Sequence, residues 1–474
     1  MDPASESYRI HTTRFQLRWL KAVDSLSAFS FGDGGLDGGD FSGPVCRPAP
    51  GKRGVFLHQR LVEAGVARVR RLGGDRAGEM RLFRFLHNPA VTVAEMVATA
   101  ACRTKNRCQG REILAIQDTT DIRCREKGDY LSLHPTLAMD AQTGSILGLV
   151  GAEFLHRDGG KRVRRKSQPF HAKESARWLR GIEAAAGLRE AGAADVTVIA
   201  DRDGDVYEDF ALRPDIVHVL IRAAQDRILT DGTRLFEKGD ALPEAGRMTV
   251  DLPASPGRRA HKMTLSLRFA RVEVTRPAKR ATRKERAALP ENVSLSLVEA
   301  REIDPPEGAE PAHWRLLTSH AVTGIEDARR IVRMYRKRWT IEQVFRTLKS
   351  KGFDIEALRI RDNEPFEKLA TATLIAAITV MQLVHERDGA ANRPLGDALD
   401  AEDAPILRRI SETLEGKTVK QKNPHPPNSL AYVAWVFARL GGWTGYYGKP
   451  GPIVLYNGMI QFHTIKHGWK LRDV

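Results

Sequence analysis

The sequence predicts an α/β fold: a mixed sheet with helices, interrupted by a β-rich insertion, with helical regions at both ends. Three observations carry this prediction. Residues 109–210 follow the order strand, strand, strand, helix, strand. Residues 211–320 contain further β-branched runs that do not continue this alternation. Residues 321–388 and 389–474, like the second half of residues 1–108, have apolar residues at helical spacing.

Residues 1–108 are predicted to be partly disordered and otherwise helical. The stretch FGDGGLDGGDFSG within residues 1–53 is glycine-rich and acidic, and we expect a flexible loop there. From about residue 55 to residue 101 the pattern is helical, with arginines between apolar residues and a break at Asn88-Pro89. Short basic helices suit a module that docks onto DNA, but a helical subdomain with exposed arginines fits equally well.

Residues 109–210 give the clearest strand signals. Three short apolar runs come first: REILAIQDTTDI, LSLHPTLAMDA and SILGLVGAEFLHR. An amphipathic helix follows in KESARWLRGIEAAAGLREAG, and DVTVIADRDGDVY is a further strand rich in β-branched residues. Three strands followed by a helix and a returning strand are the beginning of an RNase H-like fold, in which the first and fourth strands are parallel neighbours. We therefore expect an RNase H-like catalytic core, closed by the helices of residues 321–388.

Residues 211–320 are predicted to be a β-rich insertion in this core. They include a basic run, RVEVTRPAKRATRKER from Arg271 to Arg286, which we expect in a loop. Such a run either contacts DNA phosphates or is only solvated surface. The apolar stretch from Leu369 to Val384 contains threonines and is shorter than the roughly 18 residues of a membrane-spanning helix, so we expect a buried helix.

The composition points to a polyanionic partner. The chain has 474 residues and a formal net charge of +16. Such a surplus favours nucleic acid, although a solvated basic surface would give the same charge. The four cysteines include no C-x-x-C pair, so we expect neither a disulfide framework nor a zinc finger. No apolar signal segment begins the sequence, and we expect a cytoplasmic protein without a membrane partner.

Two aspartates stand where predicted neighbouring strands end. Asp118 follows the first strand and Asp201 follows the fourth, so the topology places both carboxylates at one site. Carboxylate oxygens are the ligands that Mg²⁺ prefers, and Mn²⁺ substitutes at such sites. Two ions about 3.5–4 Å apart activate an attacking oxygen and stabilise a leaving oxygen at a phosphodiester. Either aspartate alone would more often cap a turn.

A third carboxylate belongs to residues 324–352, which we expect to form one long helix. Tyr335, Arg338, Glu342 and Lys349 fall in one stripe about 60° wide, at about 100° per residue. On such a face Glu342 can bind a metal ion while the cationic side chains bind DNA phosphates. The alternative is a solvated helix face with an Arg338–Glu342 ion pair.

These blocks resemble the DDE transposases of the IS-four group, the group of the Tn-five transposase. The resemblance rests on IQDTTD, on ADRDGD and on the spacing Y-x₂-R-x₃-E-x₆-K. It extends to FRFLHNPAVT, KES-x₂-W, AHWRLLTS and SLAYVAWVFARLGGW, and runs from about residue 80 to the end of the sequence. Residues 1–53 match this family poorly.

The resemblance implies a Mg²⁺-dependent enzyme of DNA hydrolysis and transesterification. It would cleave transposon ends through a hairpin intermediate and transfer the strands into target DNA. The implied catalytic and metal-binding residues are Asp118, Asp201 and Glu342, with two Mg²⁺ ions or Mn²⁺ in their place. The residues implied to bind DNA are Tyr335, Arg338, Lys349, Trp314 and Arg222. Trp314 would stack on a flipped-out base, with a tryptophan packed in the core as the alternative.

The resemblance also implies partners. These are the terminal inverted repeats, the target DNA and a second copy of the chain in a homodimer on paired ends. Residues 1–108 would bind the ends, and residues 389–474 would form the dimer contacts.

Two other functions fit parts of the sequence. An RNase H-like nuclease that does not transpose DNA would need the carboxylates but not the full Y-R-E-K spacing. A catalytically silent DNA-binding protein derived from a transposase would fit the unusual residues 1–53, although all three carboxylates are intact. Short terminal inverted repeats beside the gene would favour a mobile element over an immobile derivative.

Overall fold

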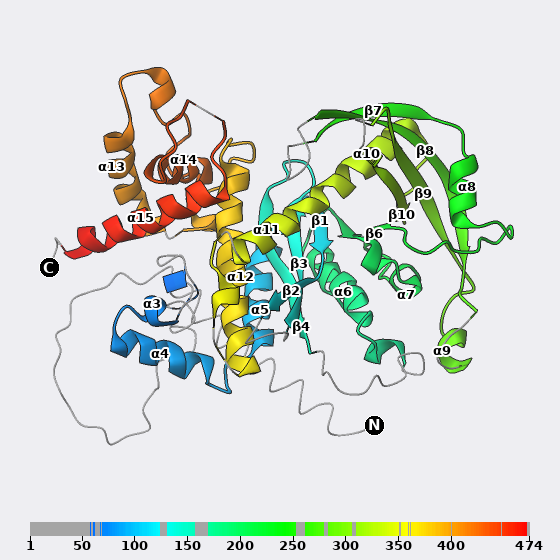
Figure 1. Ribbon diagram of the computed structural model, residues 1–474, viewed down its shortest axis with the longest axis horizontal. Coiled ribbons are helices and arrows are strands. Elements are labelled where there is room, and N and C mark those ends of the chain that lie inside the picture. Colours follow the sequence, from blue (N-terminus) through cyan, green and yellow to red (C-terminus); the bar gives the residue numbers. More distant parts are fainter. Residues whose placement is uncertain are drawn as a thin grey trace. The chain divides into compact units, whose positions relative to one another are not determined.

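The computed structural model (Figure 1) divides into two compact units. The first comprises Met1–Ala100, Arg123–Asp129 and Arg346–Val474, and the second comprises Ala101–Ile122 and Tyr130–Phe345. The predicted glycine-rich loop lies outside the described residues. The structure describes residues 57, 60–61, 67, 69–123, 130–156, 169–252, 261–278, 283–305, 310–349, 352–358, 360, 362–399, 401–446 and 448–471.

The second unit is built around one mixed sheet, with ten strands among the described residues. The order along the sheet is β2-β3-β1-β5-β6-β10-β9-β8-β7, and β4 pairs with β3. The first strands in the chain are β1 (Glu112–Gln117), β2 (Thr120–Arg123), β3 (Tyr130–Asp140), β4 (Ile146–Leu155) and β5 (Asp195–Ala200). The later strands are β6 (His218–Arg222), β7 (Gly246–Leu252), β8 (His261–Thr275), β9 (Asn292–Ile303) and β10 (His313–Thr318).

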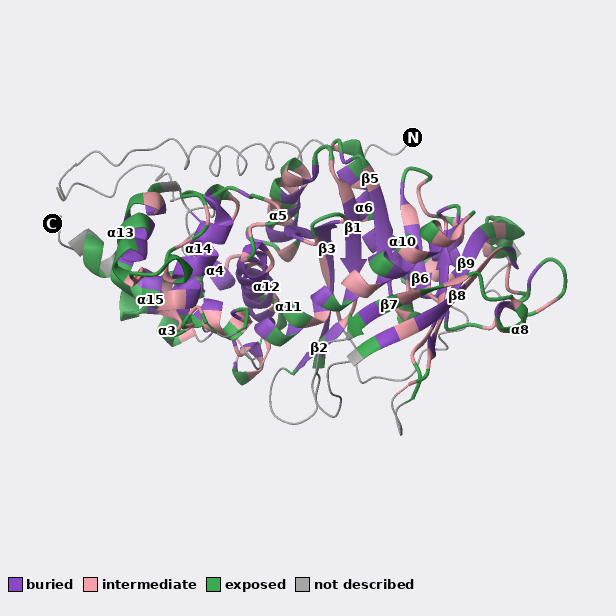
Figure 2. Ribbon diagram, turned by 90° about the horizontal axis from the view of Figure 1, so that it is seen from above, coloured by how far each residue is buried: buried purple, intermediate pink, exposed green. Residues whose placement is uncertain are grey.

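The predicted beginning of the core is confirmed. β3 pairs antiparallel with β1 and β4, and β1 pairs parallel with β5. Helix α6 (Ala176–Glu190) comes between β4 and β5 in the chain and packs against both of them. In β1 and β5 every residue after the first is buried (Figure 2), as expected of strands covered on both faces. Asp118 and Thr119 divide the first predicted run into β1 and β2.

Residues 211–320 add strands to the same sheet. β6 pairs parallel with β5, and β10, β9, β8 and β7 follow in antiparallel pairs. The expectation that the basic run from Arg271 lies in a loop is wrong, because the run begins in β8 and ends in α9 (Arg283–Ala287). Val272 and Val274 are buried, so the alternation of β8 turns the charged residues beside them outward. Two further short helices are α7 (Tyr207–Ala211) and α8 (Leu235–Ala241).

The segment expected to form one long helix is interrupted, so that prediction is wrong. A 3₁₀ turn, η5 (Lys337–Trp339), separates α10 (Ile325–Arg336) from α11 (Thr340–Leu348). Lys337 donates through Nζ to the carbonyl oxygen of Ala141, and Arg338 donates to Asp118. Both side chains of the turn thus bind residues at the sheet, and the tighter winding orients them differently from a continuous α-helix.

The regular structure of the first unit, over its described residues, is helical apart from Arg123 at the end of β2. The predicted break at Asn88-Pro89 is confirmed, because it falls between α4 (Arg76–Leu86) and α5 (Val93–Cys108). α12 packs against α4, α14 and α15, and α13 packs against α14. The other helices are α3 (Val69–Gly73), α12 (Asn363–Glu386), α13 (Ala404–Leu414), α14 (Leu430–Leu440) and α15 (Pro452–Leu471).

α12 is the one helix among the described residues that is long and apolar enough to cross a membrane. However, 89% of its most apolar window is buried inside the protein. The core helix of a soluble protein has the same length and composition. The buried helix predicted between Leu369 and Val384 is therefore confirmed.

Candidate carboxylate site

Asp118 and Asp201 stand at the same end of two neighbouring parallel strands. β1 and β5 pair so that Ile116 lies opposite Ile199. Each aspartate follows two residues after its member of this pair. Both isoleucines are almost fully buried, and both strands have neighbours on either side in the sheet. The register therefore brings the two carboxylates to one end of the sheet.

The carboxylate of Asp118 is crowded and largely buried, with 15% of the side chain exposed. Oδ1 accepts a hydrogen bond from the Thr119 N–H at 2.8 Å, and Oδ2 accepts one from Arg338 Nη1 at 2.9 Å. Burial and the negative charges of Asp201 and Glu342 raise the pKa of Asp118 to about 6, although Arg338 and the Thr119 N–H oppose this rise. Burial is the largest of these effects, and the two neighbouring carboxylates add to it.

Arg338 lies between two of the three predicted catalytic carboxylates. Besides Asp118, its guanidinium donates through Nη2 to Glu342 Oε1 at 2.9 Å. The side chain of Arg338 is 10% exposed and that of Glu342 is 42% exposed. The Arg338–Glu342 pair that the sequence offered as an alternative is therefore present, and the same guanidinium also links α11 to the end of β1.

Asp201 caps a 3₁₀ turn, η4 (Arg202–Gly204), where its Oδ1 accepts a hydrogen bond from the Asp203 N–H at 2.9 Å. Its charge acts on Asp118 and on Arg338, which places it in the same site. The three carboxylates supply only oxygen ligands, and a divalent cation would relieve the repulsion that raises the pKa of Asp118. Their chemistry therefore fits Mg²⁺ or Mn²⁺.

Three of the residues predicted to bind DNA adjoin these carboxylates. Tyr335, near the end of α10, lies beside Arg338 and Arg222, while burial raises the pKa of its hydroxyl. Its ring centroid is 5.8 Å from that of Trp314 in β10. Arg222 ends β6 and donates to the carbonyl oxygen of the residue before Trp314 at 2.8 Å. Trp314 is 8% exposed, so it is packed here as a core tryptophan is.

Lys349 belongs to the other compact unit. It directly follows Leu348, the last residue of α11. About two helical turns separate it from Glu342 along the chain. Its predicted contact with DNA therefore rests on its position in the sequence.

A chain of hydrogen bonds behind Asp118 was not expected from the sequence. Arg177 Nε donates to Thr119 Oγ1 at 3.1 Å, and this oxygen lies 2.9 Å from His134 Nδ1. His134 Nε2 lies 3.2 Å from Gln117 Oε1, and the Gln117 amide donates to the Trp178 carbonyl oxygen at 3.3 Å. Burial and the charge of Arg177 lower the pKa of His134 well below its usual value, so the ring is neutral.

The donors and acceptors in this series fit together in one direction only. Arg177 donates to the Thr119 hydroxyl, which donates to Nδ1 of His134, and Nε2–H donates to Gln117. Gln117 and Thr119 lie within IQDTTD, so this motif already pointed to two of the residues in the series. No sequence motif pointed to His134, which stands within the apolar run that forms β3. This series of hydrogen bonds fixes the side chain of Thr119, whose backbone N–H donates to the Asp118 carboxylate.

Two groups of histidines and carboxylates lie elsewhere in the second unit. In each group, one ligand atom from every residue lies within 4.8 Å of the others. Among the described residues, Asp118, Asp201 and Glu342 do not form so close a group, and Arg338 stands between two of them. The members of the two groups are Asp195, His218 and His320 in one, and Asp240, Glu299 and His313 in the other.

The first of these groups contains two neutral imidazoles. Burial lowers the pKa of His320 to about 4, and it also lowers the pKa of His218 below its ordinary value. In the second group the carboxylates already have cationic partners, because Arg315 binds Glu299 at 2.6 Å and Asp240 at 2.8 Å. The first group therefore contains neutral ring nitrogens, whereas the carboxylates of the second group are already paired with arginine.

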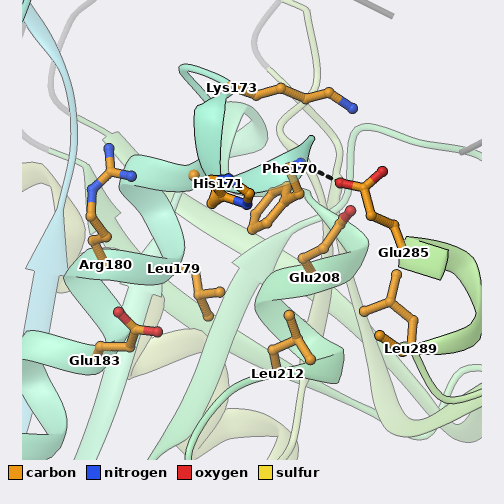
Figure 3. A pocket seen from close by; sticks show the side chains of 12 residues that line it. Phe170, His171, Lys173, Leu179, Arg180, Glu183, Glu208, Leu212, Glu285 and Leu289 are labelled. Atoms are coloured by element: carbon orange, nitrogen blue, oxygen red, sulfur yellow. Dashed lines mark hydrogen bonds between the residues drawn. The ribbon is translucent and has the colours of Figure 1, made fainter. Parts of the chain in front are cut away.

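A cavity of about 370 Å³ lies between η3 (Phe170–Ala172), α6, α7 and α9 (Figure 3). Leu179, Leu212 and Leu289 are among its apolar lining residues. Glu285 accepts a hydrogen bond from the Phe170 N–H at 2.7 Å, drawn as a dashed line in Figure 3. The residues that line it, all in the described part of the chain, include none of the predicted site residues. The cavity is therefore separate from the carboxylate site.

Most of the second unit, together with part of the first, corresponds to a known family. Residues 109–379 match a family model described as a transposase DDE domain. The match covers more than half of the chain and includes Asp118, Asp201 and Glu342. Such a domain implies DNA binding and the use of a divalent metal ion. The chain therefore belongs to the family of proteins with a transposase DDE domain.

Proposed function

We propose that the chain is a cut-and-paste DNA transposase of the IS-four group, similar to the Tn-five transposase. It cleaves transposon ends through a hairpin intermediate and transfers the strands into target DNA. One observation carries the proposal: Asp118 and Asp201 meet at the ends of two parallel strands, and Arg338 joins Glu342 to Asp118. Because all three carboxylates are present in this arrangement, we favour an active enzyme over a silent DNA-binding derivative.

Asp118, Asp201 and Glu342 are the proposed catalytic residues, and they would hold two Mg²⁺ or Mn²⁺ ions. Such ions activate the attacking oxygen and stabilise the leaving oxygen in phosphodiester hydrolysis and transesterification. Asp118 is mostly ionised at neutral pH, because its pKa is about 6. Arg338 balances part of the negative charge of Asp118 and Glu342.

The proposed DNA contacts surround these carboxylates. A guanidinium binds phosphate as well as it binds carboxylate, so Arg338 is able to serve either partner. Stacking of Trp314 on a base requires its ring face to become accessible, since the residue is 8% exposed. The proposed DNA-binding set is Tyr335, Arg338, Lys349, Trp314 and Arg222.

The proposal also covers the remaining segments. Residues 1–108 bind the transposon ends, residues 211–320 are an insertion in an RNase H-like core, and residues 389–474 provide contacts between two copies of the chain. The protein works as a homodimer on paired ends. It acts in the bacterial cytoplasm, associated with the nucleoid when it is bound to DNA.

The test uses the full-length protein, a labelled duplex carrying the element's own terminal repeat, and Mg²⁺. The wild-type protein is expected to give hairpin-ended fragments and strand-transfer products. Glu342→Gln is expected to give neither while still binding the duplex. Glu326→Gln is the matched control, because Glu326 is a carboxylate of α10 whose side chain is 69% exposed. It is expected to retain wild-type products.

Each alternative has its own result. Metal-dependent cuts without hairpins or strand transfer would indicate an RNase H-like nuclease. Binding without any metal-dependent cleavage by the wild-type protein would indicate a silent DNA-binding protein. Equal cleavage by the wild-type protein and Glu342→Gln would show that Glu342 is not a catalytic residue.

A further inference from the structure

We infer that Asp205 is a positioning residue that joins the turn after Asp201 to the segment after Arg222. β5 and β6 are parallel neighbours, with Ala200 opposite Ile221. Asp201 and Arg222 are the next residues along these two strands, at the end of the sheet that carries the carboxylate site. The inference rests on the proposed function, in which Asp201 binds a metal ion and Arg222 binds DNA.

Asp205 ends the 3₁₀ turn η4, which begins directly after Asp201, and its carboxylate binds the segment after β6. Oδ2 accepts hydrogen bonds from the Ala224 N–H at 2.7 Å and from the Gln225 N–H at 2.6 Å. Oδ1 accepts hydrogen bonds from Arg227, through Nε at 3.2 Å and through Nη2. Arg227 Nη2 also donates to the backbone carbonyl oxygen of Asp205 at 2.8 Å. Both carboxylate oxygens and the carbonyl oxygen of one residue therefore bind one short segment.

Water has almost no access to this link. None of the Asp205 side chain is exposed, and 7% of the Arg227 side chain is exposed. The guanidinium of Arg227 also lies over the ring of Phe210 in α7, 5.8 Å from the ring centroid. Buried ion pairs of this kind depend on complete hydrogen bonding, because removal of one partner leaves an unpaired charge away from water. The link therefore allows little movement between the turn and the segment.

The turn η4 is also held where it packs against the sheet. A Cβ atom at Gly204 would lie 2.6 Å from the Cβ atom of Ala200, so the backbone of the turn lies directly on the end of β5. Asp201 Oδ1 accepts a hydrogen bond from the Asp203 N–H of this same turn. The orientation of the Asp201 carboxylate therefore depends on where the turn lies, and Asp205 fixes the far end of the turn.

The bound segment begins close to Arg222, because Ala224 comes two residues later. A shift of this segment relative to η4 would change the distance between the Arg222 guanidinium and the Asp201 carboxylate. A misplacement of about 1 Å is able to lower the rate of a reaction about 100-fold. Because none of its side chain is exposed, Asp205 acts through these two residues and not through contact with DNA.

The experiment compares Asp205→Asn with Asp140→Asn in the full-length protein. Asp140 is the matched control, because it has the same kinds of partner near the start of β1. Its Oδ1 accepts hydrogen bonds from the N–H groups of Gln142 and Thr143, both at 2.9 Å, and its Oδ2 binds Arg111 at 3.1 Å. Each substitution removes the charge of a carboxylate that binds an arginine, so both should lower the midpoint of urea-induced unfolding.

Two further measurements on the folded variants separate positioning from stability. These are the affinity for Mn²⁺ by calorimetry and the rate of terminal-repeat cleavage at saturating DNA and Mn²⁺. Asp205→Asn should lower each about 10- to 100-fold, whereas Asp140→Asn should match the wild-type protein in both. Wild-type Mn²⁺ affinity in Asp205→Asn, or equal losses in the two variants, would overturn the positioning role.

A second variant covers the case in which Asp205→Asn does not fold. Asp205→Asn/Arg227→Gln leaves no unpaired buried charge but replaces charge-assisted hydrogen bonds with weaker ones. It should also bind Mn²⁺ more weakly than the wild-type protein, and wild-type affinity would overturn the inference. Lack of cleavage by the wild-type protein would contradict the proposed function, and the Mn²⁺ comparison would still test Asp205.

Discussion

At the scale of single residues, charge balance decides how the carboxylate site behaves. Arg338 is shared between Asp118 and Glu342, and its side chain is 10% exposed. Even with this partner, the pKa of Asp118 is raised to about 6 by burial and by Asp201 and Glu342. One guanidinium therefore does not offset burial and the two neighbouring carboxylates together, and a divalent cation beside Asp118 would stabilise its ionised form.

The pKa of Asp118 predicts how metal binding depends on pH. Below about pH 6 a proton and the cation compete for this carboxylate, so the affinity for Mn²⁺ should fall about tenfold per pH unit. Above pH 6 the affinity should level off. Because the folded pKa lies above the ordinary value, the contribution of Asp118 to folding stability falls as pH rises from about 4 to about 6 in the absence of metal.

Calorimetric titration with Mn²⁺ between pH 5 and pH 8 measures this dependence. Asp118→Asn is the control and should bind weakly, with a much shallower pH dependence. Equal wild-type affinities at pH 5 and pH 7 would show that Asp118 does not bind the ion.

Thr119 is a second residue with a local consequence. Thr119→Val keeps the shape of the side chain but removes the acceptor of Arg177 and the partner of His134 Nδ1. We expect a loss of stability of about 1–3 kcal/mol, because buried polar groups lose their partners. We also expect DNA cleavage and Mn²⁺ affinity about 10- to 100-fold lower, since Thr119 positions Asp118.

Thr119→Ser keeps the hydroxyl and should retain most of the activity and the Mn²⁺ affinity. Cleavage rates and Mn²⁺ titrations of the two variants provide the comparison. If Thr119→Val cleaved DNA as fast as the wild-type protein, Thr119 would have no positioning role.

At the scale of elements, the contact between α6 and the sheet supports the site from behind. α6 carries Arg177 and Trp178, which contact Thr119 and Gln117 next to Asp118. The helix approaches β1 closely at Gly181. A Cβ atom there would lie 2.1 Å from Gln117 Oε1 and 3.0 Å from Thr136 Oγ1. The absence of a side chain at this position therefore permits the hydrogen bonds that hold Gln117.

Gly181→Ala should therefore destabilise the protein by about 1–3 kcal/mol, because Gln117 is held by its own hydrogen bonds and cannot move away freely. The midpoint of urea-induced unfolding measures the effect. Gly187→Ala is the matched control in the same helix, where the nearest atom to a new Cβ is the flexible end of Lys105, at 2.9 Å. It should be neutral or stabilising by up to about 1 kcal/mol. Equal effects of the two variants would contradict the close contact at Gly181.

At the scale of the whole molecule, the net charge of +16 predicts that contacts with phosphates contribute much of the affinity for DNA. A protein that neutralises 6–10 phosphates loses about 10³- to 10⁵-fold in affinity between 50 mM and 200 mM salt. We expect a loss of this order for the full-length protein, measured by fluorescence anisotropy on a terminal-repeat duplex and on an unrelated duplex. An affinity independent of salt would contradict a binding mode dominated by phosphate contacts.

The difference in affinity between the two duplexes separates the electrostatic contribution from the sequence-specific one. The unrelated duplex measures the electrostatic contribution that charge alone provides. A higher affinity for the terminal repeat measures recognition of its sequence. Equal affinities at every salt concentration would argue against recognition of the transposon ends by this chain.

The order of the core strands, the buried helix α12 and the place of Asp118 and Asp201 after β1 and β5 could all be predicted from the sequence. These features follow from apolar runs and from turn residues, which act over a few neighbouring positions. The motif spacing also indicated the family that the comparison with known families supports. Patterns of this kind are local and can be read along the chain.

Three features depend on contacts between distant parts of the sequence: the interruption at η5, the sharing of Arg338 between two carboxylates and the series of hydrogen bonds through His134. The sequence predicted one long helix, with an Arg338–Glu342 pair as an alternative reading of its face, and the pattern along the chain does not show that Ala141 and Asp118 also bind this turn. The grouping of Asp195 with His218 and His320 was hidden for the same reason. Such contacts join residues far apart in the chain, and their energies depend on burial and distance, which arise only when the strands pair.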